Sequence, residues 1–300
     1  MKKLLVVLLL FFSSHAIALP VEITPSEVYT QVVKIDQEVN VLQEHFGITE
    51  EKKADVYTAR LLPRHVWAKT YMIMVKINVL RNKLGLPRNE PNYTEPELNL
   101  SPSLVFEQTQ RLLAELHILK KRQGIVSNRA TEQVFKNKRH IDVFNMLHHI
   151  SYQLDVINNE EINPNYVFAE VMRIHEDIIH ILRSLQLRDQ TYPPGKEKKI
   201  TPTDSLKASF SLMGEIQRLQ RGAGITRTDF SAFNKRDRVL PSDVFNMVSM
   251  CLAELQTLKA QTGLKHNVTP PAAYHEGKST SDVHQLLRWT TRMLRQIRQL

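Results

Sequence analysis

Cysteine is almost absent from this 300-residue chain, which has one, Cys251, together with nine glycines and 14 prolines. A single cysteine excludes an internal disulfide framework, even in an oxidising compartment. The modest glycine and proline counts argue against long low-complexity linkers. The hydrophobic fraction of 42% and the charged fraction of 24% are typical of a folded protein rather than a disordered one.

The motifs of common catalytic and cofactor-binding sites are also missing. The chain has no glycine-rich phosphate loop, no G-x-S-x-G nucleophile elbow and no H-E-x-x-H zinc motif. It has neither C-x-x-C-H for covalent haem nor the E-x-x-H pairs of di-iron bundles. We therefore expect a protein that is not an enzyme and that uses no cofactor or metal.

Long hydrophobic runs are confined to the first residues, MKKLLVVLLLFFSSHAIALP. Lys2 and Lys3 precede a short apolar run from Leu4 to Phe12, and Ala16-Ile17-Ala18 forms an A-x-A cleavage site. This run is too short to span a bilayer, which requires about 20 residues. The pattern predicts a bacterial signal peptide over residues 1–18, cleaved after Ala18. The mature protein is then expected to be soluble, periplasmic and not transmembrane.

The positive charge is unevenly distributed along the chain. The formal net charge is +9, yet residues 19–160 hold 18 Lys and Arg against 17 Asp and Glu, whereas residues 161–300 hold 20 against 14. The anions available in a periplasm are lipid headgroups, lipopolysaccharide and cell-wall polymers. Nucleic acid is therefore not the expected partner, although the sequence pI is about 9.5.

A repeat organises the chain. The stretch SPSLVFEQTQRLLAELHILKKRQGI, residues 101–125, has a close relative in LPSDVFNMVSMCLAELQTLKAQTGL, residues 240–264. Each of units five to eight lies almost the same number of residues after its counterpart among units one to four. That number is the separation of Val167 from Val28. This regularity predicts a tandem duplication of a four-helix unit. The eight anchor positions are Val28, Val66, Val105, Val143, Val167, Leu206, Val244 and Val283.

Each unit predicts one helix of about 20 residues. Apolar residues fall 0, 4, 7, 11 and 14 positions after the anchor, which is the spacing of helices packed side by side. Cys251 lies on this seam and is expected in the core. The helix anchored at Leu206 is expected to drift from the seam. Polar lapses on the seam are Thr70, Thr109 and Thr290.

The ends of the helices are marked by capping residues. Four Asn, Ser or Thr residues precede a proline and predict N-caps: Thr24, Ser101, Asn163 and Thr201. Four glycines follow their anchors at one shared spacing and predict left-handed C-terminal positions: Gly47, Gly85, Gly124 and Gly263.

The pattern predicts an all-α fold of eight helices, arranged as two four-helix bundles, with modules at residues 19–160 and 161–300. A single eight-helix layer or solenoid is the alternative. Connectors of about 15 residues are longer than antiparallel neighbours need. They are long enough to return along a helix, so the topology stays open between parallel and antiparallel neighbours.

Several polar residues are candidates for chemistry. Acids recur ten residues after four anchors, and we expect them on a solvated flank that forms interhelical ion pairs: Glu38, Glu115, Asp177 and Glu254. His148 and His149 point to different faces of one helix. His175, Glu176 and His180 are interpreted as surface residues rather than a metal site. The aromatic residues that follow most anchors are interpreted as packing residues.

The strongest candidate for a binding site is the C-terminal segment RWTTRMLRQIRQL. Arg288, Arg292, Arg295 and Arg298 are spaced four, three and three residues apart on one stripe of the last predicted helix. A solvated basic face is the simpler interpretation, and contact with an anionic partner is the functional one.

Two classes of function remain open. The first is an exported binding or scaffolding protein that holds a protein or an anionic envelope component. The second is a small-molecule-binding or ligand-sensing bundle, in which seam threonines and the drifting sixth helix loosen the core around a pocket. The missing catalytic motifs and the basic second half favour the first class. An enzyme is the least supported, and the sequence gives no oligomeric state.

Overall fold

The computed structural model describes residues 22–49, 54–89, 100–126, 133–159, 162–234, 238–267, 269 and 273–300. The predicted signal peptide and its cleavage site lie outside these residues. The described residues form helices and no strand, which confirms the all-α prediction. The elements are α1 (Pro25–His45), α2 (Pro63–Lys83), α3 (Pro102–Arg122), α4 (His140–Asn158), α5 (Pro164–Ser184), α6 (Pro202–Gly222), the short 3-10 helix η1 (Ser231–Phe233), α7 (Pro241–Gln261) and α8 (Thr280–Arg295).

Side-chain caps start three of the helices as predicted. At α1, the Ser26 amide donates to Thr24 Oγ1 at 3.2 Å, and the Thr24 amide donates to Glu27 Oε2 at 2.8 Å. Thr201 and Asp204 form the same reciprocal cap at α6, whereas at α5 the Asn163 side chain accepts from the Asn165 amide. The prediction for Ser101 is wrong, because its hydroxyl contacts another serine hydroxyl and no side-chain bond caps α3.

The four glycines predicted to end helices adopt the left-handed backbone conformation, as expected. Their φ angles lie between +66° and +80°, a region that favours glycine. Gly224 ends α6 in the same conformation, with φ +70°. After α5 the equivalent position is Gln186, with φ +57°, where a side chain occupies a backbone conformation that suits glycine better.

The predicted register of the sixth helix is wrong by one residue. The buried seam of α6 starts at Ser205 rather than Leu206 and continues through Ser209, Leu212, Ile216 and Leu219. The Ser209 hydroxyl donates to the Leu206 carbonyl at 2.7 Å, so the polar seam position is satisfied inside its own helix. With this register, α6 does not drift.

The seam threonines are satisfied in the same manner. Thr70 and Thr109 each donate to a carbonyl three residues earlier at 2.6 Å, and Thr290 donates to the Leu287 carbonyl at 2.8 Å. All three threonines are buried. Neither these residues nor α6 supplies a reason to expect a loosened core.

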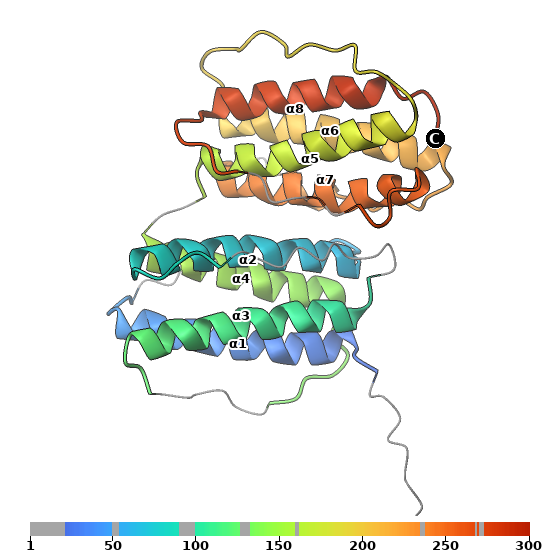
Figure 1. Ribbon diagram of the computed structural model, residues 1–300. Helices are drawn as coiled ribbons and strands as arrows, with labels where there is room; N and C mark the ends of the chain where they lie inside the picture. Colours follow the sequence, from blue (N-terminus) through green and yellow to red (C-terminus); the bar gives the residue numbers. More distant parts are fainter. Residues whose placement is uncertain are drawn as a thin grey trace, which may run out of the picture.

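Two closed rings of helices make up the fold. α1 and α2 each pack against both α3 and α4, and α5 and α6 each pack against both α7 and α8. Such rings are four-helix bundles rather than one layer. The first bundle (α1–α4) and the second bundle (α5–α8) are stacked on each other and joined through α2 and α7 (Figure 1).

Within each bundle the helices run parallel. Three contacts between α2 and α4 join residues that are 79 apart: Lys69–His148, Met72–Ser151 and Lys76–Asp155. A constant separation means that both helices advance in the same direction. The first residues of the second bundle's helices, Pro164, Pro202, Pro241 and Thr280, meet at one end of that bundle. The connector between α5 and α6, residues 185–201, therefore returns along the outside of its bundle (Figure 1).

The two bundles run antiparallel to each other. Arg64 of α2 bonds to Glu254 of α7, whereas Lys69, farther along α2, bonds to Asn246, which lies earlier on α7. Each bundle adds four aligned helix dipoles, and the opposed orientation places the positive end of one beside the negative end of the other.

The recurring acids are buried, so the prediction of a solvated flank is wrong. Glu38 and Asp177 are fully buried and each meets a lysine of a neighbouring helix, Lys120 and Lys259 respectively. The Asp177–Lys259 distance is 2.9 Å. These lysines lie 82 residues after their acids in both bundles. The predicted interhelical ion pairs exist, but they are buried: the pairs of Glu38, Glu115 and Asp177 lie within a bundle, whereas that of Glu254 joins the two bundles.

The helices of the two bundles correspond one to one when they are aligned on their first residues. Pro25, Pro63 and Pro102 then match Pro164, Pro202 and Pro241, and His140 matches Thr280. The tandem duplication itself stays a prediction from the sequence. Among the described helices, none combines the length and apolar character of a membrane-spanning segment.

Candidate functional site

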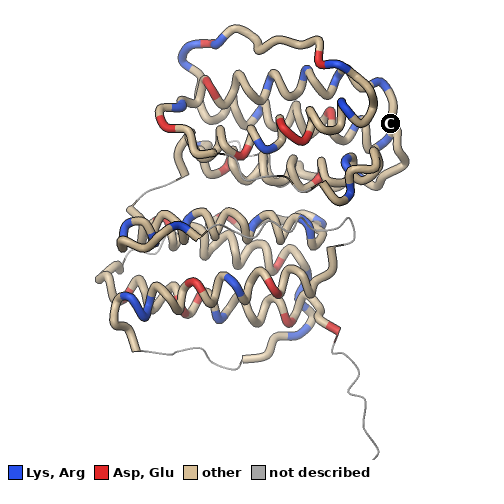
Figure 2. Tube along the Cα trace, in the orientation of Figure 1, with Lys and Arg blue, Asp and Glu red and all other residues tan. Residues whose placement is uncertain are grey.

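Three of the four predicted arginines lie on one side of α8. Arg288, Arg292 and Arg295 line an open groove of about 390 Å³ between α8 and α6. The side chains contributed by α6 include Asp204, Lys207 and Ser211, and α8 adds His284 and Thr291. The connector between α5 and α6 passes along α8 and gathers charged positions at the end next to α6 (Figure 2).

Arg298 does not belong to this groove. The helix ends at Arg295, and residues 297–300 are not helical. The predicted helical stripe therefore stops one arginine early, and Arg298 is exposed beyond it. Ile297 stays in the core even though it follows the helix.

The groove arginines differ in how far their charges are already neutralised. Arg295 Nε donates to Glu215 Oε1 at 2.8 Å, and Arg218 also bonds to this carboxylate. Arg288 pairs with Glu197 of the connector. Arg292 donates only to the Tyr192 carbonyl, at 3.4 Å, among the contacts of the described residues. Because the Arg288–Glu197 pair is exposed and such pairs contribute little, an anionic ligand can replace Glu197 at small cost.

The ionisation of His284 and Asp204 in the groove is set by local contacts. Burial lowers the pKa of His284, although Asp204 opposes that shift. The hydrogen bonds from Thr201 lower the pKa of Asp204. At neutral pH the groove therefore carries a neutral histidine and one cap carboxylate, and its positive charge comes from Lys207 and the arginines.

Lys207 is the functional candidate that sequence reasoning missed. Most units carry an aromatic residue directly after the predicted anchor, but Lys207 follows Leu206. This change from an aromatic to a basic residue is the sequence signal that could have identified Lys207. The corrected register of α6 explains the position of Lys207. With the anchor at Ser205, Lys207 lies two residues after it, on the side of α6 that faces the groove.

The remaining candidates are structural. Cys251 is buried on the seam as predicted, and burial raises the pKa of its thiol. The prediction that His175 is a surface residue is wrong, because it is buried against the Trp289 ring at 4.6 Å between centroids. Tyr29 and Phe168, which follow matching anchors, each pack beneath a lysine. Among the described residues, no three potential metal-ligating side chains come together.

A buried polar network joins the bundles and centres on Glu254. Arg64 donates to Glu254 Oε1 through Nε at 3.0 Å and Nη2 at 2.8 Å, and His65 Nε2 lies 2.6 Å from the same oxygen. The Leu62 amide donates to His65 Nδ1, so Nε2 carries the ring proton and donates to Glu254. Burial lowers the pKa of His65 and keeps the ring neutral.

Glu254 occupies the position that matches Glu115 in the first bundle. Glu115 pairs with Arg81 of its own bundle at 2.5 Å. At the position matching Arg81, the second bundle has Gln220, which bonds to Glu254 but brings no charge. Arg64 of the first bundle supplies that charge instead, so the second bundle depends on its neighbour to neutralise a buried carboxylate.

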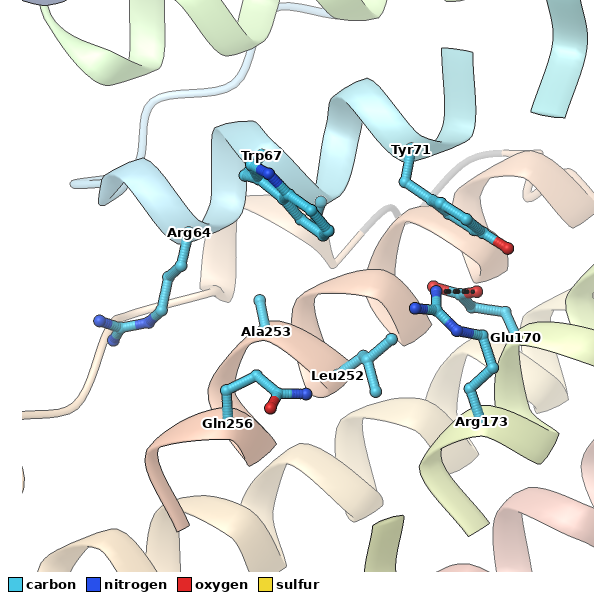
Figure 3. Close-up of a pocket in the computed structure, with 9 residues that line it drawn as sticks. Arg64, Trp67, Tyr71, Glu170, Arg173, Leu252, Ala253 and Gln256 are labelled. Carbon is cyan, nitrogen blue, oxygen red and sulfur yellow. Dashed lines mark hydrogen bonds and ion pairs between the residues drawn. The ribbon is translucent and has the colours of Figure 1, made fainter. Parts of the chain in front are cut away.

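The surface beside this network is closely packed (Figure 3). Trp67 and Tyr71 of α2 face Leu252 and Ala253 of α7, around a space of about 30 Å³. That volume is about the share of one water molecule in the liquid. The Arg173 guanidinium, bonded to Glu170, lies 4.4 Å from the Tyr71 ring. This region holds the bundles together and offers no room for a larger ligand.

Comparison with known protein families, curated proteins and solved structures finds none that matches this chain. The α6/α8 groove is lined by Lys207, Arg288, Arg292 and Arg295, and its geometry and charge indicate what it can bind.

Proposed function

We propose that this chain is an exported binding protein that holds an anionic partner of the cell envelope in the α6/α8 groove. The single observation that carries this proposal is the convergence of Lys207, Arg288 and Arg292 on one open groove. The basic second half and the predicted leader support it, since the anions of a periplasm are envelope components and their proteins. The proposed role is binding, without catalysis.

The test compares two matched triple variants of the chain lacking residues 1–18. The groove variant carries Lys207→Gln, Arg288→Gln and Arg292→Gln. The control variant loses the same charge at exposed positions of the first bundle, through Lys83→Gln, Lys121→Gln and Arg122→Gln. Each protein is mixed with phosphatidylglycerol vesicles, with cell-wall sacculi and with immobilised envelope proteins, and retention is measured at low and physiological salt.

We expect at least one fraction to retain the protein, salt to weaken that retention, and only the groove variant to lose it. Equal losses in both variants would show that overall charge, rather than the groove, causes binding. No retention by any fraction at low salt would refute the proposed function.

A further inference from the structure

The α6/α8 groove has a counterpart in the first bundle, between α2 and α4. When the helices are aligned on their first residues, the residues that line the second-bundle groove match residues of that first-bundle groove. Arg288 matches His148, Arg292 matches Tyr152, and Lys207 matches Ala68.

The first-bundle groove is occupied by the second bundle. Asn246 of α7 accepts a hydrogen bond from Lys69 at 2.8 Å, beside His148. Phe233 of η1 stacks on Tyr57 with 4.3 Å between ring centroids. His148 and Lys69 are fully buried under these contacts. This face is therefore a docking surface for a helix, since α7 packs on α2 and its Asn246 reaches Lys69 beside His148.

The two grooves are built from corresponding positions but differ in charge. At the positions that match His148 and Tyr152 of α4, the second groove has Arg288 and Arg292. Asn246, an uncharged amide, suits the first groove. Carboxylates would suit the second, because guanidinium groups bind carboxylates through paired hydrogen bonds.

A second copy of this chain does not fit the second groove. By the same correspondence, the surface that would dock is formed by α1 and α3, which match α5 and α7. At the positions matching the α5 and α7 contact residues Arg173, Asn246 and Gln256, it has Lys34, Glu107 and His117. A single carboxylate cannot pair with the row of basic side chains.

We infer that the α6/α8 groove takes an acidic α-helix of a different protein, antiparallel to α8 as α7 is to α2, with carboxylates at positions i, i+3 and i+7 facing Arg295, Arg292 and Arg288. This spacing puts the acids on one face of the helix and matches the spacing of the arginines along α8. The inference rests on the proposed function, because it identifies the chemical class of the partner that the groove holds.

The test titrates the chain lacking residues 1–18 into two labelled peptides of about 21 residues, the length of most helices here. One peptide carries its glutamates on a single helical face. The other has the same composition and helical content, with the glutamates distributed around the helix. Binding is followed by fluorescence anisotropy, and phosphatidylglycerol vesicles and inorganic phosphate are titrated in parallel. The groove and control triple variants described above are included.

We expect the one-faced peptide to bind at least about tenfold more tightly than the distributed one, and only the groove variant to remove that preference. Equal affinity of the two peptides would overturn the inference. Groove-dependent binding of vesicles or phosphate without the peptide preference would also overturn it, while leaving the proposed function in place. If every probe binds the groove variant and the control variant with equal affinity, both the inference and an anion-binding role for the groove are refuted.

Discussion

Replacing Glu254 with glutamine should destabilise the protein, since this buried carboxylate forms an ion pair with Arg64 across the bundle interface. Burial raises the pKa of Glu254, but the His65 hydrogen bond and the Arg64 charge outweigh burial and lower it from 4.5 to about 2. Such a difference corresponds to about 3 kcal/mol of folding free energy at neutral pH. We expect Glu254→Gln to lose about that amount.

The pH dependence gives the prediction its sign. A carboxyl group with a lowered pKa stabilises the fold above its ordinary pKa of 4.5, and this contribution disappears as the pH falls toward about 2. The difference in unfolding free energy between the wild type and Glu254→Gln should therefore be largest at pH 7 and shrink progressively below pH 4.5.

Urea unfolding followed by tryptophan fluorescence measures this difference. The two tryptophans, Trp67 and Trp289, lie in different bundles, so Trp67→Phe and Trp289→Phe backgrounds report the bundles separately. With a slope of about 3 kcal/mol per molar urea, the second-bundle midpoint should fall by about 1 M at pH 7. Exposed Glu107→Gln serves as the control and should change stability by less than about 0.5 kcal/mol. A loss below about 1 kcal/mol, or one that does not vary with pH, would refute the reasoning.

Three further changes test other parts of the structure. Gln186→Gly should raise the unfolding free energy by about 1 kcal/mol in thermal melts, because Gln186 has a left-handed φ of +57°; an unchanged melting temperature would contradict this. Lys259→Met should cost about 3–5 kcal/mol in urea unfolding, since it leaves the buried Asp177 carboxylate without its cation; a cost near that of a surface substitution would show that the pair is not needed. The Cys251 thiol should react with a thiol reagent only as fast as the fold opens, because it is fully buried and burial raises its pKa; rapid labelling of the native protein would contradict its place in the core.

Much of the fold follows from local sequence patterns, and the main error is one of register. Seam spacing and glycine positions predict the eight helices because both depend on residues close in sequence. The sixth helix is misplaced because Ser205 and Ser209 are polar seam residues beside apolar Leu206. Gly224 follows Ser205 at the spacing that the other glycines keep from their anchors, and this signal corrects the register.

Other features depend on residues far apart in sequence. The buried state of Glu38 follows from Lys120 on another helix, and an acid alone does not reveal its partner. The sequence does carry one signal for these partners. Lys120 and Lys259 follow the anchors of units three and seven at the same spacing, so a repeated cation accompanies the repeated acids. The basic stripe of α8 is visible in the sequence, whereas its groove requires the packing of α6 against α8.

The parallel arrangement of the helices has a consequence for the order in which the chain folds. α1 packs against α3 and α4, so its first adjacent partner, through Glu38 and Lys120, arrives 82 residues later. A fold built from such distant contacts has a high contact order and should fold slowly, because the chain must close long loops before any packing compensates for the lost entropy. A nascent chain of this topology should therefore form its first helix–helix packing only when its third helix is complete.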